Sequence, residues 1–207
     1  MKLFLASEAK HPESLKKFKK FVKRDLKGMK AVYIPTAANG KYYGSWKGGE
    51  SVKIAQSLGM DLKIVQLEDS CYSDITAPLC EADIIWMAGG MSGYLLYWIK
   101  RTKLDKILPD ILNNGTIYIG SSAGSLICAK TQNIAEWYIG EAEPGASLIP
   151  GLGLIDFEIY PHYEEKDYDE IKKRWEKGRL YLIKNGEAIT VENNKINVLG
   201  KERIIDK

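Results

Sequence analysis

The hydrophobic and polar positions in the first two-thirds of the chain alternate between short apolar runs and segments with helical spacing. The apolar runs predict strands at residues 2–6, 31–35, 62–67, 83–88 and 116–120. The spacing of apolar residues predicts helices at 12–26, at 49–58 and, in two pieces interrupted near Thr102 and Pro109, at 92–112. Strands that alternate with helices are typical of a parallel sheet covered by helices.

The last third of the chain has a different pattern. Residues 132–151 are rich in Gly, Pro and Glu and predict irregular structure. An apolar run at 154–160 predicts a further strand, and a helix is expected at 168–177.

The C-terminal tail, residues 180–205, holds three β-rich pieces separated by Asn185-Gly186 and Asn193-Asn194. Both pairs are hairpin turn signals, so this part is expected to be antiparallel. The pattern as a whole predicts an α/β fold with a mostly parallel sheet flanked by helices and a small antiparallel C-terminal part.

The length of 207 residues favours one domain spanning residues 1–207, large enough to bury a core without disulfides or metals. The balance of 30 basic and 27 acidic residues leaves a net charge of +3, and the basic run at 16–27 is interleaved with apolar residues at helical spacing. That run indicates a solvated helix face rather than a nucleic-acid patch. The apolar start is too short for a signal peptide and no stretch could span a membrane, so a cytoplasmic protein with no membrane partner is expected.

The cysteines indicate neither a disulfide framework nor a zinc site. Cys71, Cys80 and Cys128 are odd in number and form no C-x-x-C pair, which favours a reducing compartment. No metal and no cofactor are expected.

The most specific motif is Gly120-Ser121-Ser122-Ala123-Gly124, which follows a predicted strand and precedes a helical segment. This is the G-x-S-x-G nucleophile elbow in its strand–turn–helix setting. Only Ser122 has glycines two residues before and two residues after it. Ser122 is therefore the candidate nucleophile.

A serine hydroxyl needs a base, and the chain has only two histidines. His11 stands at the start of a predicted helix, where a surface or capping role is expected. His162 lies in a loop after a predicted strand and is the candidate base. The orienting acid stays open among Glu136, which follows the elbow helix, Glu164, which forms a His-x-Glu pair, and the nearby Glu158 and Asp156.

The oxyanion formed in acyl transfer needs backbone donors. One is expected from the amide of Ala123, directly after the nucleophile. The other is expected from the segment Ala88-Gly89-Gly90-Met91, because a glycine pair at the carboxyl end of a buried strand can turn its amides toward the same crevice.

Three segments together resemble the peptidase E family of serine peptidases, the aspartyl dipeptidases and their cyanophycinase relatives. They are Ala88 to Leu96, the elbow at 120–124, and Pro161-His162-Tyr163, and their order matches over about residues 1 to 165. The resemblance implies the fold of class I glutamine amidotransferases, with serine replacing cysteine as nucleophile.

The resemblance further implies Ser122 as nucleophile, His162 as base, the amides of Gly90 and Ala123 as oxyanion donors, and Glu136 as acid. Met91 and Ser92 stand where the family typically carries an Asn-Thr or Asn-Ser pair at the mouth of the site, and are the candidate substrate-binding residues. The departure at Met91 removes a polar group from that mouth.

The leading hypothesis is a cofactor-independent serine hydrolase that cleaves a peptide or related amide bond in a small peptide substrate. One alternative is a glutaminase-like amidotransferase subunit, which the serine at the elbow disfavours because serine lacks the nucleophilicity of a thiolate. The other is a non-catalytic binding or regulatory protein that retains the elbow as a turn. The sequence indicates no particular oligomeric state.

Overall fold

The computed structural model describes all residues from 1 to 207 and contains two sheets. The larger has seven strands in the order β3-β2-β4-β5-β1-β8-β9, and the smaller has three in the order β10-β7-β6. The strands of the larger sheet are β1 (Lys2–Ala6), β2 (Lys30–Ile34), β3 (Asp61–Ile64), β4 (Ile84–Met87), β5 (Ile117–Ser121), β8 (Ala188–Glu192) and β9 (Lys195–Leu199). Those of the smaller sheet are β6 (Glu158–Tyr160), β7 (Arg179–Leu182) and β10 (Ile204–Asp206).

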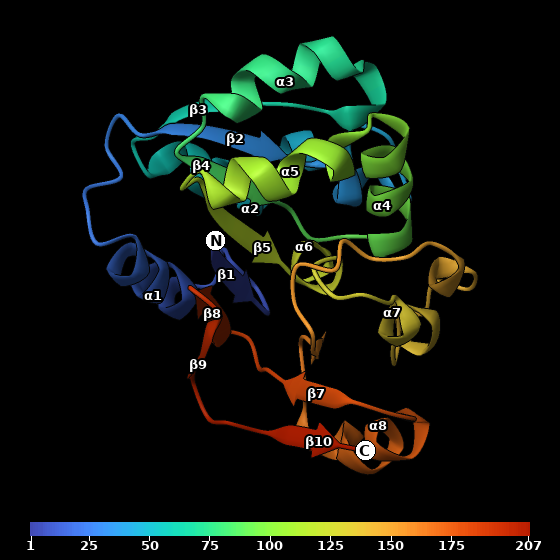
Figure 1. Cartoon of the computed structure of the whole chain (residues 1–207). Helices are drawn as coiled ribbons and strands as arrows, with labels where there is room; N and C mark the ends of the chain where they lie inside the picture. The colour runs from blue at the N-terminus through green and yellow to red at the C-terminus, as the bar shows by residue number, and fades with distance from the viewer.

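Five strands of the larger sheet are parallel and two are not. Strands β3, β2, β4, β5 and β1 pair in parallel, whereas β8 pairs antiparallel with both β1 and β9. In the smaller sheet, β7 pairs parallel with β6 and antiparallel with β10. Figure 1 shows β7 and β10 beside α8 (Tyr168–Arg174), away from the parallel strands. The predicted fold class is confirmed.

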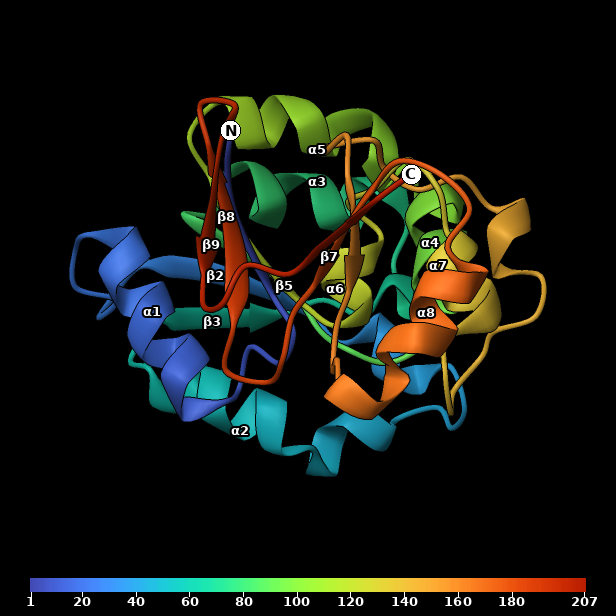
Figure 2. The ribbon, with the colours of Figure 1, turned by 90° about the horizontal axis from the view of Figure 1, so that it is seen from below.

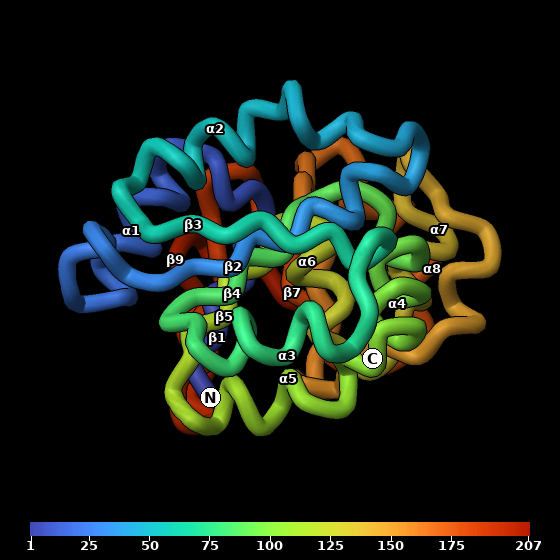
Figure 3. The backbone as a smooth tube through the Cα atoms, turned by 90° about the horizontal axis from the view of Figure 1, so that it is seen from above, coloured from blue at the N-terminus to red at the C-terminus, as the bar shows by residue number.

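Helices cover both faces of the larger sheet. Helices α1 (Pro12–Val22) and α2 (Glu50–Ser57) lie on one side, and α3 (Tyr72–Cys80) and α5 (Leu104–Asn113) lie on the other (Figures 2 and 3). The remaining helices are α4 (Ser92–Arg101), α6 (Ala123–Leu126) and α7 (Asn133–Trp137). None of these helices is long and apolar enough to cross a membrane.

The alternation of side chains along each strand explains this layering. Leu3 and Leu5 of β1 belong to the core cluster shared with α3, α4 and α5, whereas Phe4 belongs to the cluster shared with α1 and α2. Because successive side chains of a strand point to opposite faces, one apolar run supplies both cores. A third cluster, built around Tyr160, Trp175 and Leu180, joins the smaller sheet to α8.

Some local predictions were confirmed and others were wrong. The predicted break near Thr102 is confirmed, because α4 ends at Arg101, α5 begins at Leu104 and Lys103 between them takes a φ of 60°. Pro109, by contrast, does not interrupt α5. The buried residues Leu104, Leu108, Ile111 and Leu112 hold α5 against the core on both sides of the proline. Helix α3 was not predicted because Pro78 interrupts its short apolar pattern. Residues 132–151, predicted to be irregular, contain α7 and a short 3-10 turn at Ala146–Leu148.

Of the two expected hairpin turns, one forms and the other does not. Asn193 and Asn194 do connect a hairpin, since β8 and β9 pair directly across them. Asn185 and Gly186 do not, because β7 and β8 belong to different sheets. The segment between β7 and β8 instead carries the chain from the smaller sheet back to the larger one. It passes the carboxyl ends of β1 and β5, where the candidate active site lies.

Candidate active site

The elbow lies at the carboxyl end of β5, the strand between β4 and β1 in the parallel part of the sheet. Strand β5 ends at Ser121 and α6 begins at Ala123, so Ser122 alone makes the turn. Its backbone has φ 49° and ψ −108°, a conformation that a serine adopts only under strain, at a cost of about 1–3 kcal/mol. Only glycine fits at position 120, because a Cβ there would lie 2.5 Å from the carbonyl oxygen of Gly124. This geometry holds the Ser122 hydroxyl out from the sheet.

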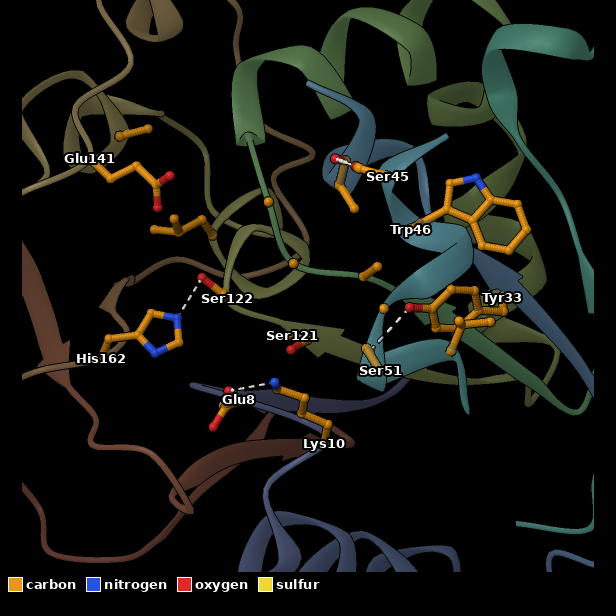
Figure 4. Close-up of a pocket in the computed structure, with 18 of the residues that line it drawn as sticks. Glu8, Lys10, Tyr33, Ser45, Trp46, Ser51, Ser121, Ser122, Glu141 and His162 are labelled. Carbon is orange, nitrogen blue, oxygen red and sulfur yellow. Dashed lines mark hydrogen bonds and ion pairs between the residues drawn. The ribbon is translucent and has the colours of Figure 1, made fainter. Parts of the chain in front are cut away.

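His162 lies opposite Ser122. It follows β6 by two residues and has a positive φ of 52°. Its Nε2 is 3.0 Å from Ser122 Oγ, a hydrogen-bonding distance (Figure 4). The structure therefore brings together the serine and the histidine that the sequence singled out, although they are far apart along the chain.

The other ring nitrogen of His162 contacts an amide. Its Nδ1 is 2.6 Å from Asn185 Oδ1, and the same Oδ1 accepts a 3.0 Å hydrogen bond from the hydroxyl of Ser7. Ser7 Oγ in turn accepts a 2.7 Å hydrogen bond from the backbone N–H of His162. An amide oxygen can only accept, so Nδ1 carries the proton and Nε2 has a free lone pair directed at Ser122.

Glu136 does not lie in this network. Its carboxylate accepts hydrogen bonds from the backbone N–H groups of Gly145 and Ser147, at 2.8 and 3.0 Å, and from the Ser147 hydroxyl at 2.7 Å. These donors lower the pKa of Glu136. The structure thus places Glu136 in the last turn of α7, where its carboxylate accepts hydrogen bonds from backbone N–H groups of the segment that follows the helix. It places Asn185 in the position beside His162 that the resemblance implied for Glu136.

Two of the other carboxylates considered from sequence, Glu164 and Glu158, have partners elsewhere. Glu164 pairs with Lys166 at 2.7 Å. Glu158 is buried, accepts a 2.7 Å hydrogen bond from Thr131, and has its pKa raised to about 7 by burial. Neither accepts a hydrogen bond from His162.

The two amides expected to stabilise an oxyanion are both free. Neither Gly90 N–H nor Ala123 N–H donates to a protein acceptor. Gly90 follows β4 with a φ of 138°, and a Cβ there would lie 2.2 Å from the carbonyl oxygen of Ala37. Both features require glycine at this position, which turns the segment after β4 toward the elbow.

A pocket of about 310 Å³ opens in front of Ser122 and His162. It lies at the carboxyl ends of the neighbouring strands β4, β5 and β1, the edge at which open parallel sheets bind ligands. Its walls include Tyr33, Trp46 and Ser51 on one side and Glu141 on the other (Figure 4). Tyr138 also lines the pocket.

The two residues predicted to bind substrate do not line this pocket. Ser92 is fully buried at the start of α4, where its N–H and hydroxyl donate to Glu143. The side chain of Met91 packs close to Gly40, since a Cβ on that glycine would lie 2.7 Å from the Met91 Cβ. Through these contacts, both residues hold the segment after Gly90 in place instead of contacting the pocket.

The thiol nearest to the elbow in sequence is unsuited to nucleophilic attack. Cys128 is fully buried, its Sγ donates to the carbonyl of Gly124 at 3.6 Å, and burial raises its pKa to about 12. A thiolate mechanism at this elbow therefore has no support from the geometry.

Sequence reasoning missed Ser7, Glu8 and Asn185. Ser7 and Glu8 follow β1 directly, and the carboxyl end of a parallel strand is a signal that could have drawn attention to them. No such signal points to Asn185. It does not follow a predicted parallel strand, and the pair Asn185-Gly186 is typical of a hairpin turn. His11 was predicted correctly: it caps α1, and its Nδ1 accepts a hydrogen bond from the N–H of Glu13.

The fold and the site are those of an α/β protein that has a nucleophile-elbow motif at the carboxyl ends of its parallel strands. Comparison with known proteins makes the assignment specific. The model of peptidase family S51 matches residues 3–199, so the chain belongs to that family and is a peptidase.

Individual relatives agree with this assignment. An uncharacterized peptidase of Listeria monocytogenes is 30% identical over 205 residues, covering 94% of this chain and 96% of the relative. A protein named Peptidase E from a Nostoc strain is 27% identical, covering 84% and 74%. A Listeria monocytogenes crystal structure provisionally assigned as a peptidase E superposes with a TM-score of 0.79 and 25% identity, covering 95% and 96% of the two chains. The resemblance found in the sequence is confirmed.

Proposed function

We propose that this peptidase is a serine hydrolase that cleaves a peptide or related amide bond in small substrates, with Ser122 as nucleophile and His162 as base. The observation that carries the proposal is the 3.0 Å contact between His162 Nε2 and the Oγ of a serine at a strained elbow. The matched family of peptidases supports an amide as the bond attacked.

In the first half of the proposed reaction, Ser122 Oγ attacks the carbonyl carbon of the substrate while its proton passes to His162 Nε2. The carbonyl oxygen becomes negatively charged and accepts hydrogen bonds from the free amides of Gly90 and Ala123. The C–N bond then breaks, and the leaving amine takes the proton from His162. An acyl ester on Ser122 remains.

In the second half, water attacks the acyl ester. His162 Nε2 accepts a proton from the water and returns it to Ser122 Oγ as the ester bond breaks. Asn185 would hold the imidazole throughout in the tautomer that has a proton on Nδ1. Since Asn185 is neutral, it orients the ring without adding a negative charge beside the imidazolium.

The pocket favours small substrates. Its volume of about 310 Å³ is at the small end of the range for ligand sites, which runs from about 300 to 1,000 Å³. A dipeptide or a short peptide end suits such a volume better than an extended chain.

The two alternatives have less support. A glutaminase-like reaction would use a thiolate, and the only cysteine near the elbow is buried with its thiol hydrogen-bonded. A non-catalytic protein would have no reason to keep His162 in hydrogen-bonding contact with Ser122. The same contact would also make Ser122 reactive toward fluorophosphonates. An elbow serine without a working base would not react with them.

A dipeptide library tests the proposed function. Release of free amino groups is measured for the wild-type protein and for Ser122→Ala, whose kcat we expect to fall about ten-thousandfold to a millionfold because the nucleophile is lost. Ser125→Ala is the matched control. The Ser125 hydroxyl is buried and donates to the carbonyl of Ala6 at 2.8 Å, so its loss should cost about 1 kcal/mol of stability and spare hydrolysis.

Undiminished hydrolysis by Ser122→Ala would exclude this serine as the nucleophile. An equal loss in a folded Ser125→Ala protein would indicate that the elbow is damaged by any substitution and that the assignment of Ser122 is unsupported.

A further inference from the structure

A buried hydroxyl group lies behind His162, outside the pocket. Ser7 follows β1 directly, is fully buried and does not line the space in front of Ser122. Its Oγ accepts the 2.7 Å hydrogen bond from the backbone N–H of His162 and donates the 3.0 Å hydrogen bond to Asn185 Oδ1. One hydroxyl therefore contacts both the histidine and the residue that orients its ring.

The direction of these two hydrogen bonds follows from the groups that make them. The backbone N–H of His162 can only donate, so it occupies a lone pair of Ser7 Oγ. The hydroxyl has one proton, and Asn185 Oδ1 is the only protein acceptor within hydrogen-bonding distance of it. The atom of the Asn185 amide that faces Ser7 must therefore be the oxygen and not the nitrogen.

The amide of Asn185 has no other anchor. Asn185 is exposed, and its Nδ2 donates to no protein acceptor, so neither packing nor a second hydrogen bond decides which way the amide faces. Half a turn about the last side-chain bond would exchange Oδ1 and Nδ2. Nδ2 would then donate to His162 Nδ1, and the ring proton would lie on Nε2.

That second orientation would disable the base. Figure 4 shows His162 Nε2 directed at Ser122 Oγ, and a proton on Nε2 would remove the lone pair that accepts the serine proton. The same half turn would leave the buried proton of Ser7 without an acceptor, which is unfavourable. The Ser7 hydroxyl thus favours the orientation of Asn185 in which His162 can act.

The position of Ser7 is fixed by the strand that also supports the elbow. The carbonyl of Ala6, the last residue of β1, accepts hydrogen bonds from the N–H of Ser122 at 3.1 Å and from the hydroxyl of Ser125 at 2.8 Å. The N–H of Ser7 itself donates to the carbonyl of Glu187 at 3.2 Å, just before β8. Ser7 therefore connects the two residues that the smaller sheet brings in to the frame that carries the nucleophile.

We propose that Ser7 is a positioning residue whose hydroxyl fixes the orientation of the Asn185 amide and, through it, the tautomer of His162 that can accept the Ser122 proton. This inference rests on the proposed function. No proton passes to or from Ser7 in the reaction, because its role is to orient the amide.

The tautomer of His162 can be measured without a substrate. The chain has only two histidines, so nitrogen chemical shifts of an isotope-labelled protein, at a pH where both rings are neutral, report each ring. His11 is an internal reference of the opposite tautomer, since its Nδ1 accepts a hydrogen bond from the N–H of Glu13. Wild-type His162 should carry its proton on Nδ1, and Ser7→Ala should raise the ratio of the Nε2–H to the Nδ1–H form about tenfold or more.

A double-mutant comparison tests whether Ser7 acts through the amide. The rate at which a fluorophosphonate labels Ser122 should fall about tenfold to a hundredfold in Ser7→Ala. Aspartate presents an oxygen to His162 whichever way it is turned, so in the Asn185→Asp protein the same substitution should cost no more than about threefold. Ser14→Ala is the matched control and should keep the wild-type rate, because Ser14 is equally buried, lies in α1 and has a hydroxyl with no hydrogen-bond partner.

An unchanged tautomer ratio in Ser7→Ala would overturn the inference, and so would equal losses of labelling rate with asparagine and with aspartate at position 185. If Ser7→Ala does not fold, Ser7→Cys takes its place in both comparisons, since a thiol of similar size is a weaker donor. A wild-type protein whose Ser122 is not labelled would overturn the proposed function, whereas the tautomer ratio would still decide whether Ser7 orients the amide.

Discussion

His162→Ala is expected to lower kcat for peptide hydrolysis by about ten-thousandfold to a millionfold, nearly as much as Ser122→Ala. The reason is that the Ser122 hydroxyl is a poor nucleophile unless a base 3.0 Å away removes its proton. The measurement is kcat under substrate saturation for the two single variants and for the double variant Ser122→Ala/His162→Ala.

The double variant tests whether the two residues act together. Residues that work as a unit show effects that are far from additive, so the double variant should be about as slow as either single one. Losses that multiply would mean that Ser122 and His162 act independently. A His162→Ala protein that keeps most of its activity would show that some other group removes the proton.

Asn185→Ala is expected to lower kcat by about a hundredfold to ten-thousandfold, with KM little changed. The 2.6 Å contact between Asn185 Oδ1 and His162 Nδ1 fixes both the ring orientation and the tautomer, and the variant loses both. Asn197→Ala, which changes an exposed side chain on the edge strand β9, is the matched control and should behave as the wild-type protein.

Asn185→Asp distinguishes a positioning role from a structural one. Aspartate can accept the same hydrogen bond, so it should restore much of the activity that alanine loses. Its negative charge also stabilises a protonated His162, so the acidic limb of the kcat/KM profile should move to higher pH. A pH profile identical to that of the wild-type protein would contradict the contact between Asn185 and His162.

The parts of the site that the sequence predicted are those that depend on local geometry. The register of Ser122 follows from glycines two residues away on each side, because the turn needs close approach of strand and helix on both sides of the serine. Gly90 was found for the same reason. Both residues follow strands that the apolar pattern located to within one residue.

The parts that the sequence did not predict depend on contacts between distant segments. Asn185 reaches His162 only because the chain crosses from the smaller sheet to the larger one after β7. Asn-Gly is also a strong local hairpin signal, so local reasoning favoured a turn. Glu136 was expected to orient His162 because of its place in the chain order. Its carboxylate instead accepts hydrogen bonds from the N–H groups of Gly145 and Ser147.

In the fold, too, the elements set by local patterns were predicted and those set by contacts between distant segments were not. The apolar runs of β1, β2, β4 and β5 are buried on both faces, which makes them easy to recognise and implies parallel pairing. Pairing of β6 with β7, by contrast, joins strands separated by α8 and follows from no local pattern. The smaller sheet determines where His162 and Asn185 lie, so the least predictable part of the fold completes the site.

Labelling with a fluorophosphonate tests the central claim most directly. The intact protein is treated with the probe, the mass of the adduct is measured, and the modified residue is mapped by peptide sequencing. The account predicts a single adduct on Ser122, with labelling much slower in His162→Ala because the hydroxyl has lost its base. Labelling of Ser121, of Ser125 or of any residue other than Ser122, or a rate that does not depend on His162, would contradict it.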